Sequence, residues 1–270
     1  MVRGKRGNET DNGMNKVLRS IKGLVPLRLR RRIKRELLDY FEVPTAEWSL
    51  NNLRRLGFAP ARVLDVGAYK GEWTQLVRNI FPDASVLMLE AQEERIPDLE
   101  TLKRAHNGKV DYRIVLLGAE ERQEVVFNKY PNAPTGNSVL NDWRSDSVKV
   151  QVKCPMRPLD AVLEETGFRP VDLIKLDVQG YELEVLKGAS GCLQTARALM
   201  MEVSLIDMYQ NNPLLHEVTA FLHQHGFVAY DIFGLMRRPL DMALAQVDML
   251  FVPEQSPLRA CKHYGRGDAI

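Results

Sequence analysis

The chain has 270 residues, 45% of them hydrophobic, so it can bury a full core and is expected to form one domain with extensions. Its aromatic, glycine and proline contents are ordinary, which excludes fibrous and wholly disordered classes of protein. No apolar run approaches the roughly 20 residues of a membrane span, and residues 1–13 lack the apolar core of a secretion signal. The three cysteines show no metal-type spacing, which indicates reduced thiols and a cytoplasmic location.

The net charge of +2 conceals an uneven distribution of charged residues. Residues 1–38 contain twelve Lys and Arg against three Asp and Glu, whereas the rest of the chain has 25 basic and 32 acidic residues. A segment of this kind, taken over residues 14–38, could contact an anionic membrane surface or a polyanionic substrate. The alternative is a solvated helical extension that packs a short Leu/Ile stripe on the core.

The chain therefore divides into three parts. We expect a basic extension over residues 1–44, partly disordered and helical in pieces between Met14 and Phe41. A main domain covers residues 45–255, and a tail covers residues 256–270.

In the main domain, a helix is expected to start at Pro44 or Thr45. From Ala61 onward, short β-branched apolar runs alternate with amphipathic stretches. The expected strands are Arg62–Val66, Ser85–Glu90, Tyr112–Leu116, Leu173–Asp177, Leu199–Val203, Val228–Ile232 and Val247–Val252. The expected helices between them are Trp73–Ile80, Pro97–Ala105, Leu159–Thr166, Tyr181–Lys187 and Leu214–His225. This alternation predicts an α/β fold with a mainly parallel seven-stranded sheet, helices on both faces, and a last strand that could be antiparallel at or near the edge.

One region interrupts the alternation. Two further strands are expected at Gln123–Asn128 and Val148–Lys153, separated by a loop that includes Tyr130 to Ser138 and is rich in Pro, Asn, Gly and Ser. Such a loop is either a tolerated surface excursion or a flap that faces a substrate.

The first predicted strand ends in the loop Asp65-Val66-Gly67-Ala68-Tyr69-Lys70-Gly71, and a helix follows. Glycine lets the backbone approach a ligand, and the helix presents free N–H groups. A dinucleotide-binding loop would need glycines at 67, 69 and 72, but Tyr69 and Glu72 occupy two of these positions. An acidic residue before the first glycine suits the cationic methionine moiety of S-adenosylmethionine better than a pyrophosphate. Asp65 could hold its amino group directly or through water, or could only brace the turn.

Two later strand ends support a cofactor site. Glu90 ends the second strand 19 residues after Gly71, where an acidic residue can accept hydrogen bonds from ribose hydroxyls. Leu116 to Ala119 would line the adenine. Each feature alone has an ordinary explanation, since glycine turns are common and Glu90 could cap a helix. Together they predict that the cofactor is bound by Asp65, Gly67, Ala68, Tyr69, Gly71, Glu90, Ala91 and Gly118.

A second group of charged residues lies in and after the strand at 173–177. Lys175 and Asp177 alternate with apolar residues, so they share one face of the strand, where burial is costly without a partner or a purpose. Lys175 could pair with Asp177 or Glu202, or contact a substrate. Asp177 lies at the carboxyl end of the strand, where open α/β sheets bind ligands. Alternatively, Asp177 and Glu182 are caps and Lys175 forms a structural ion pair.

Glu202 lies on the next strand, so two carboxylates should converge at the cleft. Methyl transfer to a hydroxyl needs alignment and then removal of a weakly acidic proton. A carboxylate whose pKa is raised by burial and a like-charged neighbour could serve as the base. The same pair could hold a divalent cation, although no specific motif supports a metal. The predicted catalytic residues are Asp177, Glu202 and Lys175.

These motifs resemble the FkbM family of methyltransferases. The resemblance rests on Arg157-Pro158-Leu159-Asp160, on the Lys-x-Asp-Val-Gln-Gly-x-Glu core at 175–182, and on Glu202-Val203-Ser204. It extends from about Arg62 to Pro253. It implies a Rossmann-like class I methyltransferase fold, S-adenosylmethionine as donor, and a hydroxyl acceptor on a sugar, polyketide or similar metabolite.

The leading hypothesis is O-methylation of a glycan or secondary metabolite. N-methylation of a small molecule or nucleic acid is a second hypothesis, but a nucleic acid is disfavoured because the body is acidic and lacks an aromatic-basic stacking platform. A third is a membrane-recruited binding module that keeps the cofactor fold without turnover. Tyr209 and His216 could contact substrate, although packing and a surface position are their simpler roles. The sequence does not indicate an oligomeric state.

Overall fold

The computed structural model describes residues 44–143, 148–263 and 265, and the described residues from Thr45 onward form one compact unit. The expectations for the basic extension before Pro44, including its helical pieces, lie outside the described residues. Within those ranges, no helix has the length and apolar character needed to cross a membrane.

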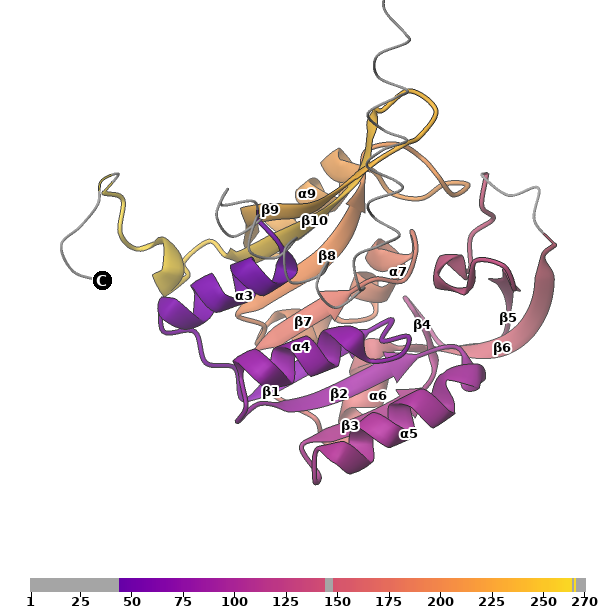
Figure 1. The fold of residues 1–270 in the computed structure, drawn as a ribbon, viewed down its shortest axis with the longest axis horizontal. Coiled ribbons are helices and arrows are strands. Elements are labelled where there is room, and N and C mark those ends of the chain that lie inside the picture. The colour runs from indigo at the N-terminus through magenta and orange to yellow at the C-terminus, as the bar shows by residue number, and fades with distance from the viewer. Residues whose placement is uncertain (1–43, 144–147, 264, 266–270) are drawn as a thin grey trace, which may run out of the picture. The chain divides into compact units, whose positions relative to one another are not determined.

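A seven-stranded sheet lies at the centre of this unit, with the strand order β3-β2-β1-β7-β8-β10-β9 (Figure 1). Neighbours from β3 to β8 pair in parallel, while β10 is antiparallel to both β8 and β9. The strands are β1 (Arg62–Val66), β2 (Ser85–Glu90), β3 (Val110–Ile114), β7 (Leu173–Leu176), β8 (Ala198–Ser204), β9 (Phe227–Arg237) and β10 (Leu244–Pro253). The predicted mainly parallel seven-stranded sheet is confirmed, and the antiparallel strand at 247–252 is second from the edge, inside β9.

Helices cover both faces of the sheet, as predicted. They are α3 (Ala46–Arg55), α4 (Glu72–Ile80), α5 (Ile96–Ala105), α6 (Leu159–Thr166), α7 (Glu182–Lys187), α8 (Ser190–Leu193) and α9 (Leu215–Gln224). Short 3-10 turns occur at η1 (Glu93–Arg95), η2 (Pro134–Gly136) and η3 (Pro257–Arg259). The first helix begins as expected, because the Thr45 hydroxyl accepts the Trp48 N–H at 3.1 Å.

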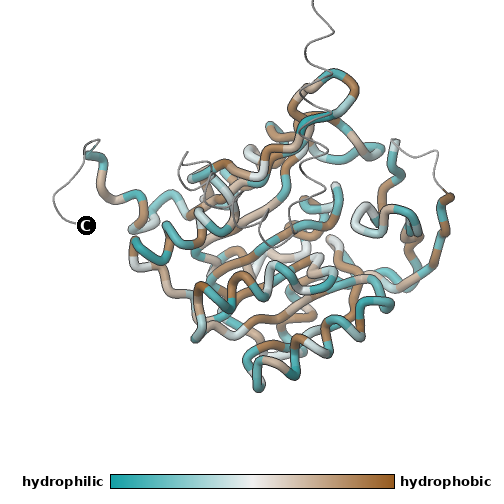
Figure 2. Tube along the Cα trace, viewed as in Figure 1, coloured by the Kyte–Doolittle hydropathy of each residue, from teal (hydrophilic) through white to brown (hydrophobic). Residues whose placement is uncertain are grey.

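Two hydrophobic cores result from the alternation of side chains along each strand. Val63 of β1 packs with Leu53 of α3 and Val77 of α4, whereas the next residue, Leu64, packs on the other face with Val162 of α6. In Figure 1, α3, α4 and α5 lie in front of the sheet and α6 lies behind it. Figure 2 shows hydrophobic residues running along the central strands, with hydrophilic residues interspersed along the helices.

The strand expected at 112–116 is confirmed as β3 only as far as Ile114, because the chain changes sheets there. The Val115 N–H still bonds to the Glu90 carbonyl at 2.7 Å, but β4 (Leu116–Gly118) then pairs with β6 (Val150–Pro158). Together with β5 (Arg122–Lys129), these strands form a second sheet of order β4-β6-β5. The strand predicted at 123–128 is confirmed, while the one predicted at 148–153 begins at Val150 and continues to Pro158.

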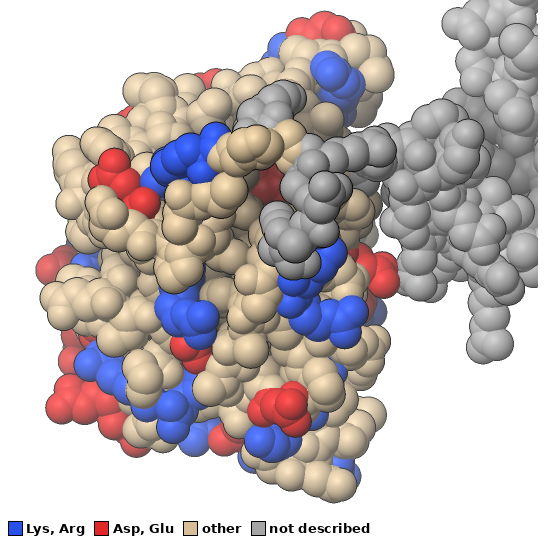
Figure 3. Space-filling model, turned by 90° about the vertical axis from the view of Figure 1, so that its left-hand side faces the viewer, with Lys and Arg blue, Asp and Glu red and all other residues tan. Residues whose placement is uncertain are grey.

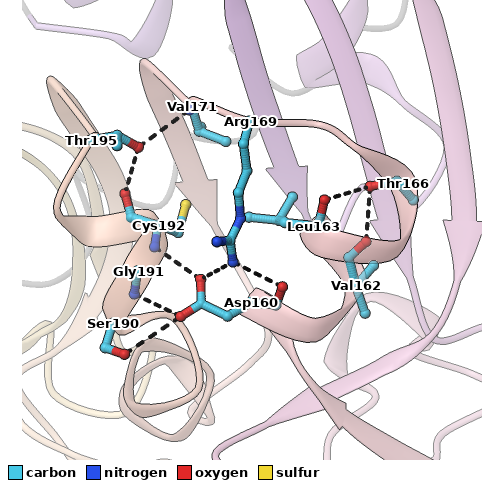
Figure 4. Close-up of polar contacts among 10 residues, drawn as sticks. All are labelled: Asp160, Val162, Leu163, Thr166, Arg169, Val171, Ser190, Gly191, Cys192 and Thr195. Atoms are coloured by element: carbon cyan, nitrogen blue, oxygen red, sulfur yellow. Dashed lines mark hydrogen bonds and ion pairs between the residues drawn. The ribbon is translucent and has the colours of Figure 1, made fainter.

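Asp160, in the first turn of α6, joins that helix to α8 (Figure 4). Its carboxylate accepts the N–H groups of Gly191 at 2.6 Å and Cys192 at 2.9 Å, and pairs with Arg169 at 2.8 Å. A Cβ at position 191 would lie 3.2 Å from both carboxylate oxygens, so glycine permits this close approach. The Arg-Pro-Leu-Asp stretch therefore contributes to the architecture of the fold.

Replacing Asp160 with alanine should destabilise the fold, because two backbone N–H groups at the start of α8 lose their acceptor. We expect the free energy of unfolding to fall by about 1–3 kcal/mol in urea denaturation. Glu100→Ala is the matched control, since it removes only an i,i+4 pair with Arg104 on α5 and should change stability by less than about 0.5 kcal/mol. Equal effects of the two substitutions would contradict this role of Asp160.

Candidate active site

A cavity of about 380 Å³ lies at the carboxyl ends of β1, β2, β7 and β8. This volume falls within the roughly 300–1,000 Å³ of small-molecule sites. Eight predicted site residues line it: Gly67, Ala68, Tyr69, Glu90, Ala91, Lys175, Asp177 and Glu202. The other three, Asp65, Gly71 and Gly118, are not among its lining residues.

The glycines of the loop after β1 are required by packing within the protein. Gly67 has φ +74°, and a Cβ there would lie 1.9 Å from the carbonyl oxygen of Asp177. Gly71 has φ +78°, and a Cβ there would lie 2.5 Å from a methyl of Leu102. The missing side chain of Gly71 therefore makes room for α5.

Glu90 fastens this loop to the end of β2. Its carboxylate accepts the Tyr69 N–H at 2.7 Å and the Gln92 N–H at 2.9 Å. Burial raises the pKa of Glu90, and these backbone donors partly oppose that rise. A carboxylate offers about four lone-pair sites, so Glu90 can still accept bonds from a ligand in the cavity.

The wall beside Glu90 is apolar. Ala91, Val115, Leu116, Leu117 and Phe127 line it, and they present surfaces that suit a flat aromatic ring. Gly118, expected to line the same wall, instead packs on β6, because a Cβ there would meet the Met156 sulfur at 2.2 Å.

A buried ion cluster connects β1 to β7. The Lys175 ammonium donates to the Gly67 carbonyl at 2.9 Å and lies 3.4 Å from both the Asp65 and Asp177 carboxylates. Burial alone would lower the pKa of Lys175, but Asp177 and Asp65 outweigh that effect and raise it, so the ammonium stays charged. Asp65 is fully buried and also accepts the Thr74 hydroxyl at 2.7 Å. The structure thus matches the alternative in which Asp65 braces the turn.

Register places further carboxylates on the same face of the sheet. Asp65 lies opposite Lys175, and Glu202 lies opposite Asp248 on β10. Burial raises the pKa of Glu202 well above its ordinary value, and the nearby carboxylates of Asp177 and others add to this rise. Burial, together with Asp177, also raises the pKa of Asp248 to about 7. The expected convergence of Asp177 and Glu202 at the cleft is confirmed.

Asp248 is a cavity residue that the sequence analysis did not single out. The sequence does contain a signal for Asp248, which is the only charged residue in the apolar run of β10. Lys175 is likewise the only charged residue in β7. Glu182 is different: it does not line the cavity, and its carboxylate accepts the N–H groups of Val178 at 3.0 Å and Gly180 at 3.1 Å. Glu182 therefore braces the turn before α7, which itself has no side-chain cap, so the capping interpretation of Glu182 is not confirmed.

The loop between β5 and β6 forms another wall of the cavity, through Thr135, Asn137 and Val139. Asn137 is buried, and its side chain accepts the Tyr130 N–H at 2.7 Å and donates to Gln92 at 2.8 Å. The loop therefore faces the site and is not a mere surface excursion. Buried polar contacts fasten it there.

Among the described residues, no three His, Cys, Asp or Glu side chains are grouped so as to hold a metal ion. His216 lies on α9 and does not line the cavity. Tyr209 is fully buried, which agrees with a packing role, and its hydroxyl also donates to the Gln179 side chain at 2.8 Å.

The parallel sheet with one inserted antiparallel strand, and a cavity at its carboxyl ends, define a class I methyltransferase fold. A family model described as the methyltransferase FkbM domain matches residues 65–229, more than half of the chain. The chain therefore belongs to the FkbM family of S-adenosylmethionine-dependent methyltransferases, and the resemblance of its motifs is confirmed.

Individual relatives are distant. The AMB antimetabolite synthetase AmbE of Pseudomonas aeruginosa is 25% identical over 177 residues, which are 53% of this chain but 8% of the synthetase. The structure of an S-adenosylmethionine-dependent methyltransferase of Clostridium acetobutylicum is 9% identical, with a TM-score of 0.45 over 84% of this chain and 99% of the other. The precorrin-6y C5,15-methyltransferase of Geobacter metallireducens is 11% identical, with a TM-score of 0.42 over 78% and 90% of the two chains.

The buried carboxylates should make stability depend on pH. The folded protein keeps the proton of Asp248 up to about pH 7, whereas the unfolded chain releases it near the ordinary value of 3.8. The folded state therefore binds more protons in this window, and the free energy of unfolding should fall as pH rises. Urea denaturation at intervals between pH 4 and pH 8 should show a shallower fall for Asp248→Asn than for the wild type. The same slope in both proteins would contradict this.

Proposed function

We propose that the protein transfers the methyl group of S-adenosylmethionine to a hydroxyl group of a glycan or secondary metabolite. The observation that carries this proposal is the Glu202 carboxylate, which lines the cavity with a raised pKa beside Asp177. A hydroxyl is a poor nucleophile until its proton is removed, and a carboxylate with a raised pKa is suited to accept it.

The cavity fits the cofactor on three grounds. Glu90 is buried at the wall with spare acceptor capacity for ribose hydroxyls, and the apolar residues around Leu117 suit the adenine ring. Gly71 at the N-cap of α4 provides no side-chain cap, so the first-turn N–H groups could bind the cofactor's carboxylate. When bound, S-adenosylmethionine supplies an electrophilic methyl group on a positively charged sulfur, which becomes a neutral thioether after transfer.

Glu202 is a better candidate for the general base than Asp177. Asp177 is held by the Lys175 ammonium at 3.4 Å and by the Gln179 amide at 2.7 Å. Among the described residues, the hydrogen-bond donors to Glu202 are neutral, namely the amides of Gln179 and Gln246. In this scheme Glu202 accepts the hydroxyl proton while the acceptor oxygen bonds to the methyl carbon. Lys175 is assigned the role of holding Asp177 and the loop after β1 in place.

Two observations favour a small hydroxylated acceptor over the alternatives. A hydroxyl must lose its proton to accept the methyl group, whereas a neutral amine can attack directly. A buried carboxylate pair therefore suits a hydroxyl acceptor better than an amine. On the part of the described surface seen in Figure 3, basic and acidic side chains are interspersed, and neither sign forms the continuous field that a nucleic acid would favour.

Cofactor binding tests the first half of this proposal. Isothermal titration should show binding of S-adenosylmethionine, and Glu90→Gln should weaken it about 10- to 100-fold, because a charged acceptor is lost. Glu93→Gln is the control, since Glu93 is exposed on the neighbouring turn η1 and should leave affinity unchanged. Absence of binding to the wild type at millimolar ligand would rule out the proposed function.

Catalysis tests the second half. Glu202→Gln should lower kcat by about 10²- to 10⁴-fold, the usual contribution of a general base, while the Kd for S-adenosylmethionine changes less than about threefold. A homocysteine-release assay over a panel of hydroxylated glycans and metabolites, with amines alongside, gives the measurement. The exposed Glu254→Gln should retain wild-type activity.

For the wild type, kcat/KM should fall as pH drops through the raised pKa of Glu202, because the base is then protonated. Transfer only to amines would favour the N-methyltransferase alternative. Binding of the donor without transfer to any acceptor would favour the silent binding module.

A further inference from the structure

We propose that Gln179 is a positioning residue, whose side-chain amide, oriented by the Tyr209 hydroxyl, holds the Asp177 and Glu202 carboxylates together at the cavity. The catalytic consequence of this arrangement rests on the proposed function, but the arrangement itself can be tested without an acceptor. Neither Gln179 nor Tyr209 is among the proposed contacts to the cofactor.

The contacts use both ends of the amide. Gln179 Nε2 donates to Asp177 Oδ1 at 2.7 Å and to Glu202 Oε1 at 3.3 Å. Its Oε1 accepts the Tyr209 hydroxyl at 2.8 Å. An amide turned the other way would place its oxygen against two carboxylates and its N–H groups against a hydroxyl. The donor from Tyr209 therefore favours the orientation that serves the carboxylates.

Tyr209 has a second acceptor within reach, the Gly136 carbonyl, but at the longer distance of 3.3 Å. A tyrosine hydroxyl has one proton to donate, and the shorter bond to Gln179 is the better one. Because Tyr209 is fully buried, its ring is fixed and the hydroxyl is presented in one place. The orientation of the amide is thus determined by packing that lies outside the cavity.

The backbone at Gln179 is in an uncommon conformation. Its φ is +56°, in the left-handed region that favours glycine, and Gly180 follows with φ +91°. The Ser138 hydroxyl donates to the Gln179 carbonyl at 2.7 Å and helps to hold this turn. A non-glycine residue held in such a conformation beside a cavity is typical of functional sites, because the strain must be offset by the surrounding structure.

A neutral donor has a specific advantage at this position. The charged groups that act on Glu202 come from three elements: Lys175 and Asp177 at β7, Glu182 of α7 and Asp248 of β10. Lys175 is already shared between Asp65 and Asp177. A second cation at position 179 would stabilise the ionised form of Glu202 and weaken it as a base, whereas an amide aligns the carboxylate and leaves it basic.

The direct test is a titration of the carboxyl groups by carbon-13 NMR in the full chain, with Glu202 assigned through Glu202→Gln. Removing the donor in Gln179→Ala should raise the pKa of Glu202 further, since its ionised form loses a hydrogen bond. Gln179→Glu should raise it more, because it adds a negative charge. Identical titrations of Glu202 in the wild type and both variants would overturn the proposal.

Kinetics provide a second test, because the expected results differ from those of a residue that only stabilises the fold. Gln179→Ala should lower kcat about 10- to 100-fold through misalignment of the base, with the Kd for S-adenosylmethionine within about threefold of the wild type. Gln179→Glu should shift the acidic limb of the kcat/KM profile to higher pH. An unshifted profile would count against the proposal.

Tyr209→Phe keeps the buried ring and leaves position 179 unchanged, so it tests the same contact on its own if Gln179→Ala does not fold, and in a double-mutant cycle if it does. We expect it to lower kcat about fivefold in the wild type but to have no further effect in the Gln179→Ala background, because Tyr209 acts through Gln179. Tyr130→Phe is the matched control. Tyr130 is buried and its hydroxyl accepts the Asp142 N–H at 3.1 Å, but it does not contact the carboxylates. Equal losses from Tyr209→Phe in both backgrounds would overturn the proposal.

The two proposals can fail separately. A wild type that binds no S-adenosylmethionine would remove the proposed function, while the NMR titration would still decide the role of Gln179. A wild type that transfers methyl groups normally, with an unchanged Glu202 titration in the Gln179 variants, would remove only the positioning role.

Discussion

The charge of Lys175 is the constraint on which the centre of the molecule depends. Its ammonium is the cation that balances Asp65, which has no exposure to solvent, and it also binds the carbonyl of Gly67. Removing one member of a buried ion pair leaves an uncompensated charge, at a cost of about 3–5 kcal/mol. One side chain therefore fixes the first strand, the loop that follows it and Asp177 relative to one another. The cavity could not keep its shape if any of these moved independently.

The two sides of the cavity are formed by different kinds of interaction. The side near Glu90 uses main-chain donors and apolar side chains, so its geometry is determined by how β2 and the loop after β1 end. The opposite side uses side chains that cluster through sheet register, with Glu202 facing Asp248 across antiparallel strands. Like charges in that position are unfavourable when both are ionised, and burial raises the pKa of both carboxylates. The wall around Glu90 and the carboxylates around Glu202 are thus placed in one cavity by independent features of the fold.

The alternation of apolar and polar residues along strands was enough to predict most of the sheet and part of the site. It placed Lys175, Asp177 and Glu202 at adjacent strand ends, and parallel register then brought them together as expected. The same rule fails where a strand changes partners, and Val115 marks such a point, since its N–H bonds to β2 while the next residue pairs with β6. Gly118, three residues further on, consequently packs on Met156 of β6 and does not line the cavity.

The part played by Gln179 was beyond sequence analysis, because it depends on a left-handed backbone and on Tyr209, which lies 30 residues away along the chain. Local patterns carry no information about which distant hydroxyl will face an amide. Asp248 could have been found, since a lone charge in an apolar strand was the signal that identified Lys175.

The way in which the loop between β5 and β6 is anchored has a consequence for evolution. Asn128 donates to the carbonyls of Val139 and Leu140, and Asn137 accepts the main-chain N–H of Tyr130, so these anchors hold main-chain atoms. Thr135 lines the cavity, and its side chain takes no part in these anchors. Mutations at that position can reshape the pocket while leaving its scaffold intact. Descendants of one ancestral methyltransferase could in this way come to take different acceptors without first having to regain stability.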